Sequence, residues 1–390
     1  MKILGIHVTD DSREEVLGRI EGFLESDRQN IVVTPNPEII LAAQDDEKLF
    51  HILNIASLSL ADGIGLKLMG LLLGENVVRI TGADLVVDIL KMAQSRKSNV
   101  GIINWSGGLS SFGEIKKTLE EKFVGIKVFV TDIAEKDFNN KNISFVSLSN
   151  CEIILANLGA PYQEKIIFNN LPQFPKARVL IGIGGALDFL TGKIARAPFI
   201  LRKIGMEWLW RLIKQPTRIK RIINAVIVFP LRFFKFHFIN CFFYRPNVAC
   251  LLYKKSESGY SFLLISRSDI EHHWQVPQGG LDGLNAEEAA KKELSEELGT
   301  DKFVTKAIVK NIYRYKYVDK KTVVKHRGYK GQKQDLYIAE FIGNDEDIKV
   351  KTWEHAGWQW VSENEFISSL HQDRRKSGEL FLDKFQKLTK

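Results

Sequence analysis

The stretch RKIGMEWLWRLIKQPTRIKRIINAVIVFPLRFFKFHFINCFFYR, residues 202–245, divides the chain into two parts with different patterns. This basic aromatic segment has ten lysines and arginines against one acid, Glu207, so its net charge of +9 exceeds the +8 of the whole chain. Basic and aromatic side chains together suit a membrane interface, where anionic head groups cover an apolar layer. Nucleic acid is the rival partner, because such residues also bind phosphates and stack on bases. The third interpretation is a pair of amphipathic helices whose apolar face is core.

Length and composition predict an ordinary globular protein. A chain of 390 residues suits two or three domains, and 45% hydrophobic with 26% charged residues allows large cores. Three cysteines without close pairing indicate a reducing compartment. The N-terminal MKILGIHVTDDS is too short in apolar residues for a signal peptide and is expected to form a first strand.

No uncharged run reaches the roughly 20 residues that cross a membrane. The best candidate, Ile222 to Leu231, is ten residues long and is followed by Arg232 and Lys235. We therefore expect a cytoplasmic protein that lies peripherally on the inner face of the cell membrane, at an anionic surface.

Residues 1–200 alternate between strand-like and helix-like runs. Expected strands are Lys2–Ile6, Asn30–Thr34, Leu58–Ala61, Val100–Ile103, Lys127–Val130, Glu152–Ala156 and Val179–Ile183. Amphipathic helices are expected between them, as at Ser12–Ser26, Glu38–Asp46, Gly82–Ser95 and Gly113–Lys122. This alternation predicts a Rossmann-like, mostly parallel α/β sheet with helices on both faces. In such sheets ligands bind beyond the carboxyl ends of the strands.

Polar and glycine-rich turns follow most of these strands. They are TPNPE (34–38), ADGIG (61–65), RITGAD (79–84), NLGAPYQE (157–164) and GIGGALDF (182–189). One such turn by itself is an ordinary tight turn, whereas five on one rim suit a nucleotide diphosphate.

These motifs, with GIGGALDFLTGKIARAP (182–198) and RKIGMEWLWRLIKQPTR (202–218), resemble the WecG/TagA/CpsF glycosyltransferase family over residues 1–240. The resemblance implies inverting transfer of N-acetylmannosamine or a related sugar from a UDP-sugar donor to an undecaprenyl-pyrophosphate-linked acceptor. Asp62 would be the general base and Thr34 its neighbour. The remaining predicted substrate contacts of the rim are Asn36, Arg79, Gln163, Gly184 and Gly185.

Inverting transfer needs one carboxylate to take the acceptor proton. No Asp-x-Asp pair lies near the rim, so cations and backbone N–H groups must meet the charge of the leaving group. No cofactor is expected for this half. NWSGG (104–108) replaces the glycine-led loop of the family and leaves donor specificity open.

The resemblance also assigns a role to the basic aromatic segment, since in this family a C-terminal appendage contacts the membrane and closes over the site. Arg211, Arg218 and Arg221 stand at spacings of seven and three, on one helical face unless Pro216 interrupts it. They would bind the acceptor pyrophosphate. The alternative is a solvated cationic face.

A different pattern starts at Pro246. Asn247–Tyr253 and Tyr260–Ser266 are expected strands, and Ala286–Leu298 is an expected helix that begins at an Asn285–Glu288 capping box. On this helix three carboxylates at i, i+3 and i+4 share a face and suit magnesium or manganese; they are Glu293, Glu296 and Glu297.

GGLDGLNAEEAAKKELSEELG (279–299) resembles the Nudix box, whose pattern is G-x5-E-x7-R-E-U-x-E-E-x-G-U. Its loop is one residue short, and Leu284, Lys292 and Thr300 replace the first glutamate, the arginine and the closing aliphatic residue. WQVPQGG (274–280), YKGQKQDLYIAEF (329–341) and EHAGWQWVS (354–362) resemble RNA pyrophosphohydrolases and dinucleoside polyphosphate hydrolases. By that match Glu354 is a fourth metal or base carboxylate.

The run Tyr313 to Lys316 lies where a base could stack and a polyphosphate could be bound, with Tyr315 and Lys316 as the predicted contacts. Its alternative is an alternating edge strand. Glu296 and Glu354 would serve hydrolysis of a nucleoside polyphosphate by metal-activated water.

The sequence therefore predicts a bifunctional enzyme with three parts: a transferase core (1–200), a basic membrane-binding appendage and linker (201–245), and an α+β Nudix domain, an α/β/α sandwich (246–390). A catalytically dead, nucleotide-sensing Nudix domain is one alternative. The other is an RNA 5′-end pyrophosphohydrolase whose basic segment binds nucleic acid. Donor sugar, Nudix substrate, the reason for the fusion and homo-oligomer formation stay open.

Overall fold

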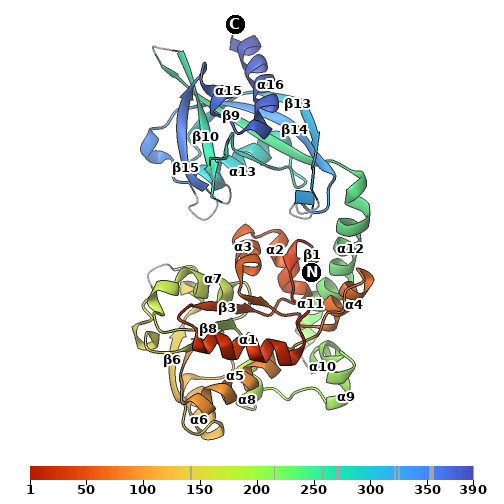
Figure 1. The fold of residues 1–390 in the computed structure, drawn as a ribbon, viewed down its shortest axis with the longest axis vertical. Coiled ribbons are helices and arrows are strands. Elements are labelled where there is room, and N and C mark those ends of the chain that lie inside the picture. Colours follow the sequence, from red (N-terminus) through yellow and green to blue (C-terminus); the bar gives the residue numbers. More distant parts are fainter. Residues whose placement is uncertain are drawn as a thin grey trace. The chain divides into compact units, whose positions relative to one another are not determined.

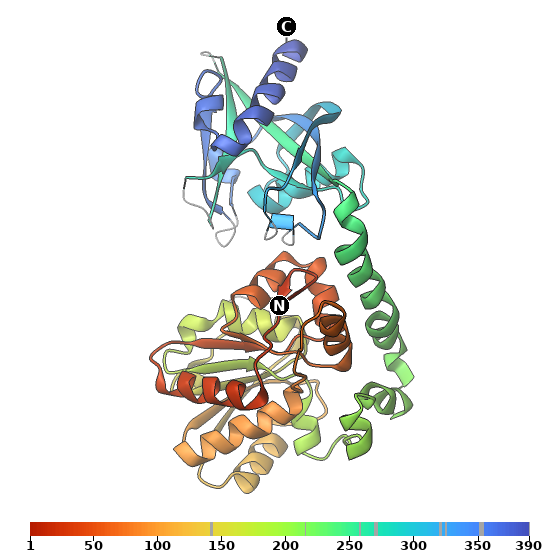
Figure 2. The same ribbon diagram turned by 45° about the vertical axis from the view of Figure 1, so that its right-hand side comes forward.

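The computed structural model describes residues 1–140, 143–214, 216–256, 259–268, 272–319, 322–323, 326–350 and 355–389, without the side chains of Arg211, Lys214, Arg218, Ser256 and His355. The chain divides into two compact units, Met1–Lys235 and Phe236–Lys390. Each unit has its own sheet and core (Figures 1 and 2).

Six parallel strands form the sheet of the first unit, in the spatial order β4-β3-β8-β7-β5-β6. In chain order they are β3 (Asn30–Val33), β4 (Leu58–Ser59), β5 (Asn99–Trp105), β6 (Lys127–Ile133), β7 (Ile153–Asn157) and β8 (Val179–Gly182). Every residue of β3, β7 and β8 is buried, as expected for parallel strands covered on both faces. The predicted α/β class is confirmed.

Helices cover both faces of this sheet. In Figure 1, α2 (Pro37–Gln44), α3 (Glu47–Ile55) and α7 (Tyr162–Asn169) lie above the strands, and α5 (Gly82–Arg96) and α6 (Phe112–Lys122) lie below them. The remaining helices before residue 195 are α1 (Arg13–Glu25), α4 (Ile64–Leu72) and α8 (Ala186–Leu190), with 3-10 turns at Glu135–Asp137, Val146–Leu148 and Leu171–Gln173. Apolar side chains of α1, α5 and α6 share one core cluster with the strands.

The predicted first strand, Lys2–Ile6, is wrong in detail. The structure has a hairpin of β1 (Lys2–Ile3) and β2 (Ile6–His7), separate from the parallel sheet. Leu4 and Gly5 adopt positive φ angles of 49° and 81°, so they form the turn that the apolar pattern concealed. An apolar run alone does not reveal such a turn.

The basic aromatic segment is mostly helical. Its elements are α9 (Phe199–Lys203), α10 (Glu207–Lys214), a 3-10 turn (Pro216–Arg218), α11 (Ile219–Ile223) and α12 (Phe229–Phe234), with π-helical turns at Asn224–Val228 and Lys235–Ile239 and a 3-10 turn at Asn240–Phe242. Pro230 lacks an N–H and its ring would clash with the carbonyl four residues back. The wider π turn just before α12 accommodates this proline without ending the helix.

Within the described residues one helix, Ile219–Phe242, is long and apolar enough to cross a membrane by length and composition. Its most apolar stretch of 18 residues has a mean hydropathy of 1.6, and 17% of that stretch is buried. The expectation concerned uncharged runs, and this helix reaches its length only by including charged residues, among them Arg232 and Lys235. Phe229 and Phe233 on it are fully buried, and Arg232 lies 3.4 Å from Asp45 of the first unit. Part of the helix is therefore packed against the first unit.

The second unit is built on a mixed sheet with the order β11-β10-β9-β14-β13, where β12 also pairs with β9 and β15 with β10. Only β9 and β14 are parallel among the described pairs. The strands are β9 (Arg245–Ser256), β10 (Gly259–Arg267), β11 (Trp274–Gln275), β12 (Gln278–Gly280), β13 (Phe303–Lys316), β14 (Gly331–Phe341) and β15 (His355–Ser362).

Helices cover both faces of the second sheet. The α13 helix (Ala286–Leu298) and α16 (Gln372–Thr389) contribute to separate core clusters that share the strands, and α15 (Phe366–Ser369) and a 3-10 turn (Asp345–Asp347) complete the unit. Asn285 and Glu288 form the expected capping box of α13. This is the predicted α/β/α sandwich.

Candidate functional site

The carboxyl ends of the six parallel strands meet at one edge of the first sheet. From β5 the chain runs outward to β6, whereas from β7 it runs in the other direction to β8, so the strand order reverses between β5 and β7. Ligands of open α/β sheets bind at such an edge, near the reversal. The predicted rim residues follow strands at this edge, except Arg79, which is joined to it by an isolated bridge to Ala61.

Thr34 and Asp62 converge on one point of the rim. A Cβ atom added to Gly82 would lie 3.3 Å from Thr34 Oγ1 and 3.8 Å from Asp62 Oδ2. Thr34 is 7% exposed and directly follows β3, and the Asp62 N–H donates to Pro35 O (2.9 Å). The structure therefore brings the Thr34 hydroxyl and the Asp62 carboxylate near each other, as the resemblance implied, and adds Gly82 beside them. A carboxylate so placed can receive a proton.

Asn36 acts as the N-cap of α2. Its Oδ1 accepts from the Ile39 N–H at 2.9 Å, and Pro37 occupies the first helical turn. This cap fixes the direction of the loop that carries Thr34. The predicted role of Asn36 in substrate binding stays a prediction.

The basic aromatic segment packs on the Asp62 loop. A Cβ on Gly65 would lie 2.9 Å from Pro37 Cγ and 4.0 Å from the Phe229 ring, so this loop is enclosed between the Thr34 loop and α12. Gly205 approaches Ile64 closely, because a Cβ there would lie 2.7 Å from the Ile64 Cβ. These contacts place the segment beside the predicted transfer centre.

Arg79 and Arg221 both connect the rim to that segment. Arg79 Nη1 donates to Arg202 O at 3.0 Å. Arg221 forms three hydrogen bonds with the Glu38 carboxylate, at 2.7, 2.9 and 2.7 Å, and this partner raises the arginine's pKa. The side chains of Arg211 and Arg218 lie outside the described residues. Substrate contacts by these arginines stay predictions.

Gln163 joins two of the glycine-rich loops. Its Oε1 accepts from the N–H groups of Gly159 (3.2 Å) and Gly184 (2.8 Å), and its Nε2 donates to Glu164 Oε1 (2.8 Å). The side chain is 3% exposed, so in this structure it positions the loops after β7 and β8. Gly184 has φ 51°, and a Cβ on Gly185 would lie 3.0 Å from Asp188 Oδ2.

Three polar features at this edge were not predicted. Glu164 is 3% exposed, and burial raises the pKa of its carboxyl group. Asp84, within the RITGAD motif, accepts from Thr81 and lies 2.6 Å from Arg196 Nη2, which ties the start of α5 to the 182–198 loop. Asn157, Asn104 and Asp132 form a hydrogen-bonded chain across three strand ends. Polar residues at strand ends were the available signal, but pairing between distant strands decides the contacts.

In the second unit, α13 presents the predicted carboxylates near β12. A Cβ on Gly279 would lie 1.8 Å from Glu293 Oε1, so only glycine fits against that carboxylate. Glu297 is 5% exposed, and Lys292 Nζ lies 3.8 Å from Glu296 Oε1. Burial, and then the charges of Glu297 and Glu293, raise the pKa of the Cys250 thiol, which indicates that these two carboxylates lie near the same strand.

Oxygen donors of this kind match magnesium or manganese. However, the described residues contain no group of three or more His, Cys, Asp or Glu arranged to hold a metal ion. Glu354 lies outside the described residues. The donor chemistry therefore fits a metal, whereas the assembled ligand set stays a prediction.

Tyr315 lies inside a small polar cluster. Its hydroxyl donates to Gln332 Oε1 and accepts from Arg374 Nη1 (2.8 Å), and its ring stacks on Tyr313 at 5.7 Å. Lys316 is exposed at the end of β13. The run alternates inward and outward as a strand does, so both the structural and the binding interpretation of Tyr315 and Lys316 stay open.

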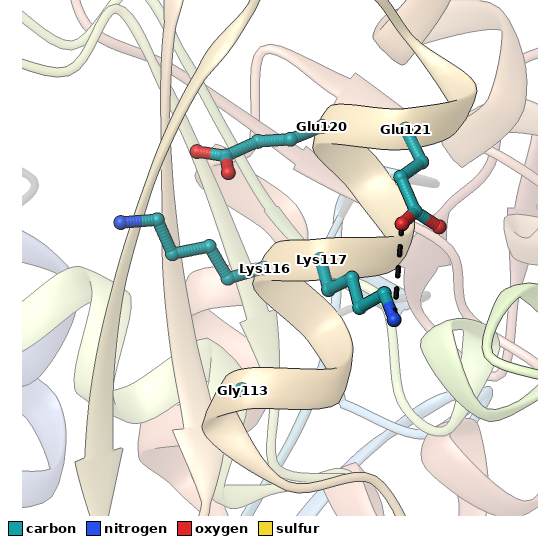
Figure 3. Close-up of a pocket in the computed structure, with 5 residues that line it drawn as sticks. All are labelled: Gly113, Lys116, Lys117, Glu120 and Glu121. Atoms are coloured by element: carbon teal, nitrogen blue, oxygen red, sulfur yellow. Dashed lines mark ion pairs between the residues drawn. The ribbon is translucent and has the colours of Figure 1, made fainter.

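A shallow hollow over α6 is lined by residues of that helix alone, namely Gly113, Lys116, Lys117, Glu120 and Glu121 (Figure 3). Lys117 and Glu121 pair across it at 3.9 Å. No strand end contributes to it, and we assign it no part in the site.

Comparison with known proteins gave two family matches. Residues 1–240 match the sequence model described as the glycosyl transferase WecG/TagA/CpsF family, and residues 243–383 match the NUDIX domain. Two curated relatives are each named N-acetylglucosaminyldiphosphoundecaprenol N-acetyl-β-D-mannosaminyltransferase. The one from Bacillus subtilis (strain 168) is 31% identical over 195 residues, 50% of this chain and 75% of that protein. The one from Staphylococcus aureus (strain MRSA252) is 28% identical over 230 residues, 58% and 89% respectively. A solved structure of a Caenorhabditis elegans Ap4A hydrolase binary complex is 23% identical, covers 37% of this chain and 97% of its own, and has a TM-score of 0.30.

Proposed function

The chain belongs to the WecG/TagA/CpsF family of glycosyl transferases, and from that premise we propose which sugar and acceptor its first unit uses. The donor is UDP-N-acetylmannosamine or a closely related UDP-sugar. The acceptor is a sugar linked through pyrophosphate to undecaprenol, and the product serves synthesis of a surface polysaccharide or teichoic-acid-type polymer. The substrate named for the curated relatives supports this proposal.

The observation that carries the proposal is that Thr34 Oγ1 and Asp62 Oδ2 both lie within 4 Å of the position that a Cβ on Gly82 would occupy. In our mechanism the Asp62 carboxylate takes the proton of the acceptor hydroxyl as that oxygen attacks the anomeric carbon. The bond to UDP breaks on the opposite side, which inverts the anomeric configuration. Thr34 orients the acceptor or the carboxylate, and Arg79 and Arg221 are two described cations near this edge that could neutralise pyrophosphate charge.

The test is transfer from a panel of UDP-sugars to a lipid-linked acceptor, with the product identified by mass. Asp62→Asn should lower the turnover number by about 10²–10⁴-fold, the range that a positioned general base contributes. Asp27→Asn is the control, because the Asp27 side chain is fully exposed. Full activity of the Asp62 variant would contradict the assigned base, and no transfer from any UDP-sugar would contradict the proposed reaction.

We also propose that the basic aromatic segment attaches the enzyme peripherally to an anionic membrane. Exposed apolar side chains support this: Ile213, Ile219, Ile223, Leu231, Phe234, Phe242 and Phe243. The buried Phe229 and Phe233 and the Arg232–Asp45 contact favour a helix held against its own protein over one that crosses the bilayer.

The rival partner of the basic aromatic segment is RNA. Co-sedimentation with anionic vesicles that persists at high salt, with RNA binding lost, supports the membrane; the reverse result supports RNA, whose phosphate contacts weaken steeply with salt.

For the second unit we propose metal-dependent hydrolysis of a nucleoside polyphosphate. Glu293, Glu296 and Glu297 would hold magnesium or manganese, which when bound would supply an activated water and neutralise phosphate charge. Gly279 lets the Glu293 carboxylate lie against the β12 backbone. The second candidate is a nucleotide-binding domain without hydrolysis, favoured by Lys292 in place of the box arginine and its position 3.8 Å from Glu296.

A further inference from the structure

A hydrogen-bonded chain of three polar side chains, two of them buried, crosses the strand ends where the strand order reverses. Asp132 of β6, Asn104 of β5 and Asn157 of β7 stand opposite one another in the sheet register. Asn104 Nδ2 donates to Asp132 Oδ1 at 2.8 Å, and Asn157 Nδ2 donates to Asn104 Oδ1 at 2.8 Å. Asn104 is 1% and Asn157 8% exposed. Nothing in the proposed transfer step uses these residues.

The direction of every amide in this chain is fixed by its partners. Asn104 Nδ2 faces Asp132 Oδ1 and also Ser110 O (3.3 Å), and both of these atoms only accept hydrogen bonds. Asn104 Oδ1 must therefore face Asn157. A reversed Asn157 amide would place two oxygens against each other, so its Nδ2 faces Asn104 and its Oδ1 points away.

Asn157 Oδ1 is then a buried acceptor without a hydrogen-bond donor among the described residues. Buried polar atoms in native proteins are almost always hydrogen-bonded to protein, water or ligand. An oxygen can only accept, so whatever meets it must carry an N–H or O–H.

The position of Asn157 along the edge matches one end of the proposed donor. Thr34 follows β3, and β7 lies two strands from β3, about 10 Å at roughly 4.8 Å per strand. The loop of Gly184 and Gly185 follows β8, which lies between them. In a UDP-sugar two phosphates and a ribose separate the anomeric carbon from the base. With the sugar at Asp62 and the phosphates near β8, the nucleoside reaches β7.

We propose that Asn157 Oδ1 accepts a hydrogen bond from the imide N3–H of the donor's uracil ring. This inference rests on the proposed transferase function and names the residue that selects its nucleotide. The same ring position of cytosine is an unprotonated acceptor, so Asn157 Oδ1 favours uridine over cytidine nucleotides. The atom is covered by protein in this structure, so binding of the ring requires a local rearrangement of the residues that cover it.

The experiment measures binding of UDP, CDP, N3-methyl-UDP and 2′-deoxy-UDP to the full chain. The variants are Asn157→Ala and, as a matched control, Asn99→Ala at the opposite end of β5, where Asn99 Nδ2 donates to Asn150 O. The wild-type chain should bind UDP about 10-fold more tightly than CDP or N3-methyl-UDP, the scale of one hydrogen bond in a desolvated site. Asn157→Ala should bind UDP about 10-fold more weakly and no longer distinguish these three nucleotides.

Each remaining outcome overturns a specific statement. Equal binding of UDP and N3-methyl-UDP by the wild-type chain removes the imide contact, and this measurement needs no variant to fold. A loss of discrimination against 2′-deoxy-UDP, with N3-methyl discrimination kept, in Asn157→Ala would move the contact to a ribose hydroxyl. Failure of the wild-type chain to bind UDP at all would contradict the proposed function itself.

Discussion

Arg221 and Glu38, 183 residues apart in the chain, form a forked ion pair with Nε–Oε1 and Nη2–Oε2 distances of 2.7 Å each. Glu38 stands in the first turn of α2, directly after the loop that carries Thr34, and Arg221 stands in α11. The pair therefore holds a guanidinium next to the predicted transfer centre. A fork that fits a carboxylate also fits a phosphate, so the acceptor pyrophosphate can replace Glu38 as its partner.

The first prediction tests whether Arg221 only holds the basic aromatic segment in place or also contacts the substrate. Arg221→Glu should lower transfer by about 10–100-fold, the value of a charged hydrogen bond to phosphate. The exchanged double variant, Glu38→Arg with Arg221→Glu, restores an ion pair but leaves no guanidinium at position 221, so transfer should stay low. The two side chains are 53% and 30% exposed, so loss of the ion pair should change the free energy of unfolding by about 1 kcal/mol or less. Recovery of transfer in the double variant would show that Arg221 only fastens the segment.

The second prediction concerns Gly82, which lies against Thr34 and Asp62. Gly82→Ala should lower transfer clearly while the thermal midpoint of the first unit hardly changes. The added methyl group would lie 3.3 Å from Thr34 Oγ1 and 3.8 Å from Asp62 Oδ2, where the acceptor hydroxyl is expected. In the first turn of α5 an alanine is otherwise well tolerated.

Gly18→Ala is the matched control for that variant. Gly18 lies inside α1, and an added Cβ there meets nothing within 4 Å. It should raise stability by about 0.5–1 kcal/mol and leave transfer unchanged. Equal transfer by both variants would show that the acceptor does not enter the space beside Asp62.

These sites show how far the sequence alone could lead. Thr34 and Asp62 could be paired beforehand through the family resemblance, and the rule that carboxyl ends of parallel strands share an edge is consistent with that pairing. The Glu293 carboxylate and its helix could also be placed, since the helix period and the Asn285 capping box are local signals.

What could not be predicted depends on contacts between distant segments. The direction of the Asn157 amide is set by Asp132 through Asn104, and those partners come from three strands whose register no local pattern reveals. Gln163 was expected to face substrate, yet its Oε1 is occupied by the N–H groups of two loops. The pairing of Arg221 with Glu38 has the same origin.

The third prediction tests whether the second unit is a catalytically active hydrolase. Glu296→Gln should abolish magnesium-dependent release of phosphate or pyrophosphate from nucleoside polyphosphates, because a neutral amide is a weak ligand for a hard cation. Magnesium should also raise the thermal midpoint of the second unit in the wild-type chain and not in the variant.

Glu287→Gln on the same helix is the control for the metal prediction, since Glu287 pairs with Lys291 and Thr305 rather than with the predicted ligand face. It should retain both responses. A wild-type chain that binds nucleotide but shows neither hydrolysis nor a magnesium shift would favour the nucleotide-sensing alternative.

The fourth prediction is a pH dependence that originates at His273. This side chain is 4% exposed and stacks on His371 at 4.1 Å. Burial first, and then the charges of neighbouring groups, lower its pKa to about 4; those groups are His371, Arg267 and Arg374, opposed by Asp373. The unfolded chain keeps an ordinary histidine pKa of about 6.5.

Between these two pKa values the unfolded chain binds a proton that the folded second unit excludes. Stability of that unit should therefore fall as the pH drops from about 6.5 towards 4, by at most about 1.4 kcal/mol per pH unit from this one group. His273→Phe, which keeps a ring to stack on His371, should flatten the slope of unfolding free energy against pH. His272→Gln changes the exposed neighbour and should leave the slope as it is. If His273→Phe keeps the wild-type slope, the acid sensitivity arises at other groups, because a phenyl ring binds no proton in either state.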